Sequence, residues 1–214
     1  MIKETIIKKH INFDNDLNKF DDKLSLNIKR NNILIIGGAG TIGSSYIKQI
    51  LKYKPSKITV VDMNENGLTE LTRDLRSSNL LDYNPEYITY PVNLLSDTFD
   101  KVFNSESWQV VANFSAHKHV RSEKDKISVE ALIKNNVFGA IKLLKLCELN
   151  PPKYFFSVST DKAANPVNIM GASKSLMEKL ILSKKEKFKV STARFANVAF
   201  SNGSLLDGFI YRLN

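Results

Sequence analysis

The chain has 214 residues, of which 43% are hydrophobic and 25% are charged, the proportions of an ordinary globular domain. No apolar run approaches the roughly 20 residues that a membrane-spanning helix requires, the N-terminus lacks the apolar core of a signal peptide, and the single cysteine excludes an internal disulfide. The formal net charge of +9 comes from scattered basic residues rather than an arginine-rich stripe, so we expect a cytoplasmic protein that binds neither membrane nor nucleic acid.

The predicted elements begin after residues 1–30, which are polar and charged and are interpreted as an N-terminal extension with room for a short helix. From residue 32 onward, short runs of apolar and β-branched residues alternate with amphipathic segments. The short runs predict strands at 33–36, 58–61, 87–90, 110–114, 154–158 and 188–195. The amphipathic segments predict helices at 41–53, 66–76, 126–149 and 170–184.

Strands this apolar are buried on both faces, as in a parallel sheet that helices cover. Repeated strand–helix units with right-handed crossovers build a doubly wound sheet. We therefore expect an α/β fold of the Rossmann type over residues 31–214, with a doubly wound parallel sheet and helices on both faces. Ligands of such a sheet bind at the carboxyl ends of the strands. The polar segments at those ends are 37–43, Asp62, 115–120, 159–162 and 194–197.

A glycine-rich turn joins the first predicted strand to the first predicted helix, which is the context in which such turns bind a pyrophosphate. Glycine permits the tight turn and lets backbone N–H groups approach the phosphates, and the helix N-terminus adds a favourable dipole. The turn has the sequence Gly37-Gly38-Ala39-Gly40-Thr41-Ile42-Gly43. We take Gly37, Gly40, Thr41, Ile42 and Gly43 as cofactor-binding residues.

Two side chains at the ends of the next strands complete the predicted cofactor site. Asp62 ends the second strand, where a carboxylate accepts hydrogen bonds from the adenosine ribose hydroxyls. Because that carboxylate repels a 2′-phosphate, we expect NAD rather than NADP, although Arg73 and Arg76 on the following helix leave NADP open. Asn93 follows the third strand, where it either hydrogen-bonds the adenine edge or simply forms a turn.

Four segments resemble a known family. The spacing Gly37-x-x-Gly40-x-x-Gly43 resembles the extended short-chain dehydrogenase/reductase superfamily. Three further segments look like its polysaccharide-biosynthesis branch, which contains the UDP-N-acetylglucosamine 4,6-dehydratases. They are Ser115-Ala116-His117-Lys118-His119-Val120, Ser159-Thr160-Asp161-Lys162-Ala163-Ala164-Asn165-Pro166 and Met170-Gly171-Ala172-Ser173-Lys174. The resemblance covers roughly residues 31–210 and implies a nucleotide-sugar 4,6-dehydratase acting on UDP-N-acetylglucosamine.

In that superfamily a Tyr-x-x-x-Lys pair carries out the redox chemistry, and one turn of helix places both side chains on one face. The lysine matches Lys174, which the resemblance implies to hold the nicotinamide ribose. The tyrosine position holds Met170, which cannot exchange a proton. Some members of the branch resemble this chain in having methionine there, so the base for the sugar 4-hydroxyl is unassigned. The alternative interpretations are a packing methionine and a surface lysine.

The resemblance also assigns roles to the segment after the fifth predicted strand. Thr160 matches a hydroxyl that hydrogen-bonds the sugar near C4, and Asp161 and Lys162 match the pair that eliminates water. Following the related dehydratases, Lys162 removes the C5 proton if its pKa is lowered, and Asp161 protonates the C6 hydroxyl if its pKa is raised. The alternative for Asp161 and Lys162 is a salt bridge in a loop.

Other matches support the same site. Asn136 lies on the apolar side of the long predicted helix, and family members use this position to brace the active-site backbone. Lys118 and His119 follow the fourth strand beside the expected nicotinamide, and Asn197 matches an asparagine that touches the substrate, so these three are substrate-binding candidates. His117 and His119 do not form a metal site, because no third ligand has suitable spacing.

Two other functions stay open: an epimerase or reductase of nucleotide sugars on the same scaffold, and a non-catalytic NAD-binding regulatory module, which Met170 favours. Epimerases usually retain the tyrosine and lack the Asp-Lys pair. The resemblance further implies a homo-oligomer formed through the helices at 126–149 and 170–184. Because the family usually continues with a small substrate-binding part, we also expect that the 214-residue chain lacks this part and is catalytically weak by itself.

Overall fold

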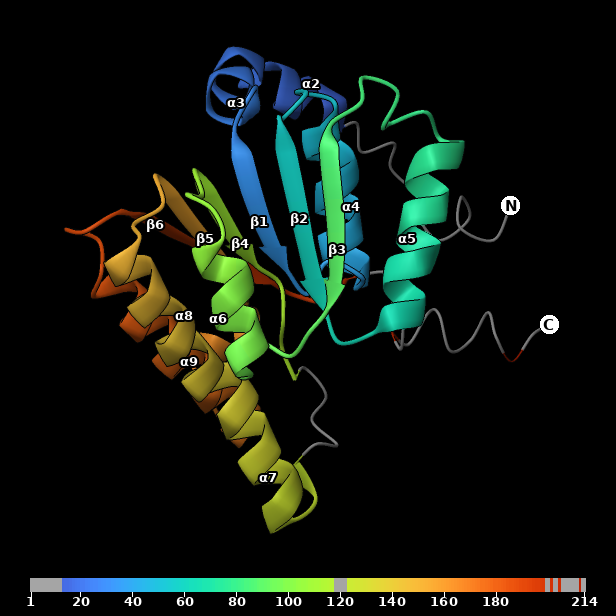
Figure 1. The fold of residues 1–214 in the computed structure, drawn as a ribbon. Helices are drawn as coiled ribbons and strands as arrows, with labels where there is room; N and C mark the ends of the chain where they lie inside the picture. The colour runs from blue at the N-terminus through green and yellow to red at the C-terminus, as the bar shows by residue number, and fades with distance from the viewer. Residues whose placement is uncertain (1–12, 118–122, 199–200, 202–203, 205–211, 213–214) are drawn as a thin grey trace.

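The structure, a computed structural model, describes residues 13–117, 123–198, 201, 204 and 212. Its centre is a sheet of six parallel strands in the order β3-β2-β1-β4-β5-β6 (Figure 1). The strands are β1 (Asn32–Ile36), β2 (Lys57–Asp62), β3 (Glu86–Pro91), β4 (Val110–Asn113), β5 (Tyr154–Thr160) and β6 (Lys189–Phe195). The predicted doubly wound parallel sheet is confirmed, and its strand order reverses between β1 and β4, which is where such sheets bind ligands.

Helices cover both faces of this sheet because alternate side chains of each strand point to opposite faces. In β1, Ile33 and Ile35 pack in the core beneath one pair of helices, and Leu34 and Ile36 pack in the core beneath the others. The first face carries α4 (Thr41–Leu51) and α5 (Glu65–Ser77). The second face carries α6 (Asp97–Asn104), α8 (Gly139–Leu149) and α9 (Ile169–Leu182).

The helix α6 is an element that the sequence interpretation omitted. It is short, but Phe99, Val102 and Phe103 are buried in the core at the spacing of one helical face. The Ser96 hydroxyl accepts a hydrogen bond from the amide of Phe99 at 3.3 Å and caps the helix. A capping serine followed by apolar residues three and four positions apart is the signal that identifies this helix.

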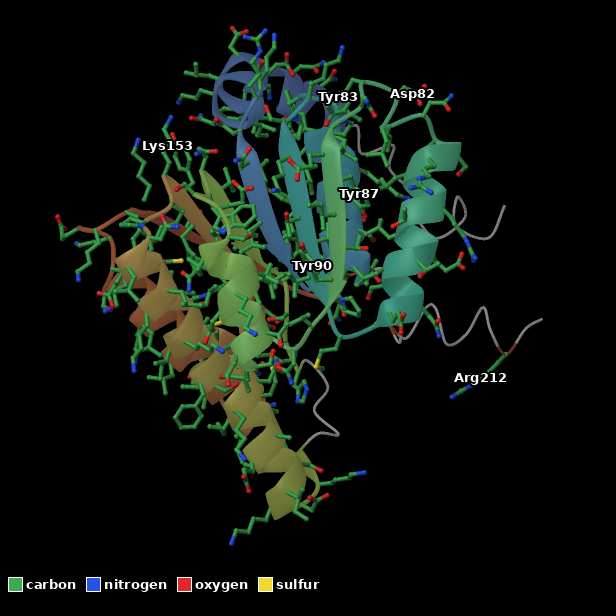
Figure 2. All side chains as sticks on the ribbon, viewed as in Figure 1. Asp82, Tyr83, Tyr87, Tyr90, Lys153 and Arg212 are labelled. Carbon is green, nitrogen blue, oxygen red and sulfur yellow. The ribbon has the colours of Figure 1, made fainter. Side chains whose placement is uncertain are left out.

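The N-terminal segment forms two helices, α2 (Phe13–Asn18) and α3 (Asp21–Ile28), at the amino ends of the strands (Figure 1). Ile28 is buried in the sheet core, and the hydroxyl of Tyr154 donates a 2.8 Å hydrogen bond to the side-chain oxygen of Asn27. The side chain of Lys153 lies at this same end of the sheet (Figure 2). The segment therefore packs on the end of the sheet that is farthest from the predicted ligand site.

The long predicted helix at 126–149 is interrupted. It consists of α7 (Lys126–Ile133), a π-helical turn η2 (Lys134–Phe138) and α8, and α7 projects beyond the carboxyl end of the sheet (Figure 1). Such π turns are rare and occur most often at functional sites. Within the described residues, no helix has the length and apolar character needed to cross a bilayer.

Candidate active site

A cavity of about 820 Å³ lies at the carboxyl ends of the strands, between β1 and β4 and their neighbours. Most of the site residues that the sequence predicts line it: Gly37, Gly40, Thr41, Ile42, Gly43, Asp62, Asn93, Thr160, Lys162, Met170, Lys174 and Asn197. Asp161 lies next to this lining but does not form part of it. Lys118 and His119 fall outside the described residues.

The glycine turn passes so close to the end of β4 that side chains are excluded from it. Gly37 has a φ of +77°, and a Cβ atom there would lie 2.5 Å from the amide nitrogen of Ser115. A Cβ atom on Gly43 would collide with the carbonyl oxygen of Gly37. Helix α4 begins directly after Gly40, which offers no capping side chain. The first turn of α4 therefore faces the cavity as a site suited to an anionic group such as a pyrophosphate.

Asp62 holds the glycine turn in place as well as lining the cavity. One carboxylate oxygen accepts a 3.0 Å hydrogen bond from the amide of Ala39, and the other accepts a 3.0 Å hydrogen bond from the amide of Asn64. The sequence predicts contact with the ribose but not this structural role. A carboxylate has about four lone-pair sites, so two amide bonds leave room for ribose hydroxyls.

Asn93 shows both features that the sequence leaves open. Its side-chain oxygen accepts a 2.8 Å hydrogen bond from the amide of Leu95, as in a turn, and the residue is also part of the cavity lining. The side-chain oxygen of Asn93 is therefore used by the turn, while contact of Asn93 with an adenine ring stays a prediction.

Lys174 and Met170 lie one helical turn apart on α9, and both are buried against the cavity, each 3% exposed. The Lys174 ammonium donates to the carbonyl oxygen of Val158 at 3.2 Å and lies 3.6 Å from the sulfur of Met177. Burial lowers the pKa of Lys174 to about 8, and the charge of Glu178 opposes that change. This burial excludes the alternative interpretation of Lys174 as a surface lysine.

Thr160, Asp161 and Lys162 form a hydrogen-bonded group where β5 runs into a short 3-10 turn, η3 (Asp161–Ala163). The Thr160 hydroxyl donates to Asp161 Oδ1 at 2.8 Å, and the Lys162 ammonium donates to the same oxygen at 3.3 Å. The hydrogen bond from Thr160 and then the contact with Lys162 hold the pKa of Asp161 below its usual range. This arrangement favours the carboxylate, so the raised pKa on which the role of Asp161 as an acid depends is not present here.

Asn136 occupies the π turn and binds both backbone groups of His117. Its side-chain oxygen accepts from the His117 amide at 2.9 Å, and its side-chain nitrogen donates to the His117 carbonyl at 3.1 Å. The same nitrogen lies 3.1 Å from the hydroxyl of Ser173 on α9. Asn136 thus joins the segment after β4 to α9, which is the bracing position that the family resemblance implies.

One ion pair near the cavity escaped the sequence interpretation. Arg194 at the end of β6 donates from Nη2 to Glu178 Oε2 at 2.7 Å and from Nε to Glu178 Oε1 at 3.0 Å. Glu178 is 5% exposed and lies one turn after Lys174 on α9. That i, i+4 spacing from Lys174 is the signal that points to Glu178. Among the described residues, no group of three potential His, Cys, Asp or Glu metal ligands gathers.

Comparison with known proteins identifies sequence relatives. A family described as polysaccharide biosynthesis protein matches residues 33–214. The chain is 36% identical to an uncharacterized membrane protein from Methanocaldococcus jannaschii, over 83% of this chain and 52% of the relative. It is 32% identical to a UDP-N-acetylglucosamine 4,6-dehydratase (inverting) from Campylobacter jejuni, over 83% and 52%. A UDP-glucose 4-epimerase from Rickettsia bellii is 28% identical, over 85% and 53%.

The fold is also similar to solved structures. The X-ray structure of Pen from Bacillus thuringiensis matches with a TM-score of 0.74 and 29% identity, over 87% of this chain and 56% of that chain. This chain spans about half the length of the curated relatives that it matches.

Proposed function

The chain belongs to the polysaccharide biosynthesis protein family, a branch of the extended short-chain dehydrogenase/reductase superfamily, and from that premise we propose that it forms part of an NAD-dependent enzyme that modifies nucleotide sugars. The reaction that its residues support best is the 4,6-dehydration of UDP-N-acetylglucosamine. The observation that carries this proposal is the presence of Thr160, Lys162 and Lys174 around one cavity, next to the glycine turn.

The residues present fit a dinucleotide. The glycine turn and the first turn of α4 would hold the pyrophosphate, because a side chain at Gly37 would fill the space and the helix dipole favours negative charge. Asp62 would accept hydrogen bonds from the adenosine ribose and disfavour a 2′-phosphate, and Lys174 would hold the nicotinamide ribose. Bound NAD supplies a hydride acceptor that the side chains of this chain cannot provide.

The side chains after β5 would carry out the elimination. Thr160 would hydrogen-bond the sugar near C4. Once C4 is a ketone, the C5–H bond is acidified, so that a lysine of modest basicity can remove this proton. Lys162 would accept the C5 proton, the C5–C6 double bond would form, and the C6 hydroxyl would leave as water with a proton from Asp161. The hydride removed from C4 would then return to C6 and a proton exchanged with solvent would be added at C5, so that the net change is the loss of one water.

This assignment requires a neutral Lys162 and a protonated Asp161, which is the reverse of the observed ion pair. The two states differ by one proton moved from the ammonium to the carboxylate across their 3.3 Å contact. The side chains of Asp161 and Lys162 are now 50% and 40% exposed, which favours the charged pair. A sugar that covers them would remove water, and burial in a low-dielectric site favours neutral forms.

The two rival functions make different use of the site. An epimerase is favoured by the name of the Rickettsia relative, but an epimerase has no need for a proton donor at C6, which Asp161 supplies. A non-catalytic NAD-binding module is favoured by Met170, but it has no need for Thr160 and Lys162 beside the cavity.

An isotope experiment separates these functions. A full-length form of the enzyme of which this chain would be part is incubated with NAD and UDP-N-acetylglucosamine in deuterated water, and the products are analysed by mass spectrometry and NMR. We expect a 4-keto product that has lost one water and carries deuterium at C5, because the proton removed by Lys162 is replaced from solvent. A product of unchanged mass would indicate an epimerase, and the absence of any product would favour the regulatory module.

We also propose that the protein forms a homo-oligomer through α7, η2, α8 and α9. Large apolar side chains lie on the outer surface of these helices although others on the same helices face the core. They are Ile127, Phe138, Leu176 and Leu182, with exposed fractions of 79%, 54%, 47% and 50%. Light scattering at micromolar concentration should give at least a dimer, and a monomer would contradict this proposal.

A further inference from the structure

Glu178 is the nearest acidic neighbour of Lys174 along α9, and a side chain from another element fixes its position. Met170, Lys174 and Glu178 are spaced by four residues on α9, and all three are buried. Arg194 lies at the end of β6, and its guanidinium donates one hydrogen bond to each carboxylate oxygen of Glu178. This bidentate geometry gives the strongest arginine–carboxylate contacts. The side chain of Arg194 is 49% exposed and that of Glu178 is 7% exposed, so the arginine of this ion pair is in contact with solvent whereas the carboxylate is buried.

We propose that Glu178, clamped by Arg194, is a positioning residue that sets the charge of Lys174 and therefore the charge that the cavity presents to a bound dinucleotide. Neither Glu178 nor Arg194 lines the cavity, so both act through Lys174 rather than on a ligand. The value of this arrangement to catalysis rests on the function proposed above, whereas the control of charge is a property of the chain itself.

The physical basis is a balance of three effects on one ammonium. Burial disfavours the charged form of Lys174, and the carboxylate of Glu178 favours it. Arg194 lowers the pKa of Glu178 and keeps it ionised. By Coulomb's law, the positive charge of Arg194 must also offset part of the field of Glu178 at Lys174. Burial outweighs the attraction of Glu178 and leaves Lys174 with a pKa of about 8, close enough to neutrality for its charge to respond to a ligand.

The other charged groups next to α9 are hydrogen-bonded, paired or exposed. Glu123 accepts a 2.7 Å hydrogen bond from the amide of Met170. The rest are Asp161 and Lys162 on η3, Lys126 and Glu130 on α7, Lys134 on η2, Lys142, Lys145 and Glu148 on α8, and Lys189 on β6. Among the described residues, Glu178 is the charged group that acts on the pKa of Lys174. The effect of the Glu178–Arg194 pair on the pKa of Lys174 can therefore be measured separately from that of other charged groups.

The competing explanation is that the pair merely fastens β6 to α9. The two explanations differ in sign. Removing the carboxylate in Glu178→Gln should lower the pKa of Lys174, whereas removing the cation in Arg194→Gln should raise it, because the carboxylate then acts without a neutralising partner. Loss of packing alone would expose Lys174 in both variants and would move its pKa in the same direction, toward the ordinary value.

The test is an NMR titration of protein labelled with ¹³C at the lysine ε-carbons, with the Lys174 signal assigned by its loss in Lys174→Met. We expect a midpoint near pH 8 in the parent, a decrease of about one pH unit in Glu178→Gln and an increase in Arg194→Gln. The matched control is Glu148→Gln, which removes an outer carboxylate bound to Lys184 and should leave the midpoint unchanged.

A second variant keeps the test decisive if Glu178→Gln does not fold. Arg194→Lys retains the positive charge, so its midpoint should stay near that of the parent while that of Arg194→Gln rises. Equal midpoints in Arg194→Gln and the parent, or shifts of the same sign in Glu178→Gln and Arg194→Gln, would overturn the proposal. Because the titration uses neither substrate nor turnover, a failure of the proposed dehydratase activity would leave this result unaffected.

Discussion

The two halves of the site are made of different parts of the chain. The cofactor half, from β1 to β2, is built mainly from backbone: the glycine turn, the first turn of α4, and Asp62 fixed by two amides. The half that would carry out the chemistry, from β5 to α9, is built from side chains such as Thr160 and Lys174. A backbone site tolerates no added atom where two backbone segments approach most closely, as at Gly37 and Gly43, whereas a side-chain site tolerates replacements of equal shape. Substitutions in one half should therefore abolish NAD binding, and substitutions directly after β5 in the other should lower turnover without affecting NAD binding.

The largest effect is expected in the side-chain half. Lys162→Met and Asp161→Asn should each lower the turnover of the proposed dehydratase by about 10²–10⁴-fold, the usual range for general acid–base groups. The affinity for NAD, measured by calorimetry, should stay at the parent value because neither residue is part of the glycine turn that would hold the pyrophosphate. Near-parent turnover in both variants would return Asp161 and Lys162 to a plain surface salt bridge.

The backbone half should respond to a single methyl group. Gly37→Ala should reduce the free energy of unfolding by about 2–4 kcal/mol and abolish NAD binding, because the position has a positive φ and the new Cβ would overlap the backbone at Ser115. Gly40→Ala is the matched control, since its Cβ would meet the nearest atom at 3.5 Å, an ordinary contact. Equal losses of stability in both variants, measured by chemical denaturation, would show that the close approach at Gly37 is not the cause.

A smaller effect is expected when Lys174 is replaced, and here the free energy of unfolding should increase rather than decrease. Its folded-state pKa of about 8 lies below the ordinary 10.5, so the folded state binds fewer protons between these values and the contribution of Lys174 to stability rises as pH increases through this window. Lys174→Met should therefore stabilise the fold at pH 7 by about 1–3 kcal/mol while weakening NAD binding. The gain should shrink toward pH 10 in denaturation curves, and a gain that does not change with pH would contradict it.

More of the cofactor half than of the other half can be predicted from the sequence, and the reason is physical. The glycine turn, Asp62 and the six strands follow from local patterns, because periodicity and backbone constraint act over a few residues. The roles of Thr160 and Lys162 come from resemblance alone. The lowered pKa of Asp161 depends on which hydroxyl donates to it, and the pairing of Glu178 with Arg194 joins residues 16 positions apart on different elements, so no local pattern reveals either.

The nicotinamide cofactor site is tested most directly by calorimetry of dinucleotide binding to this chain, with the Lys162→Met and Gly37→Ala variants measured in parallel. We expect the parent to bind NAD, and to bind NADP more weakly because Asp62 repels the 2′-phosphate. Lys162→Met should bind like the parent, and Gly37→Ala should not bind. Tighter binding of NADP would overturn the role of Asp62. If neither dinucleotide gives a heat of binding, this cavity does not hold a nicotinamide cofactor.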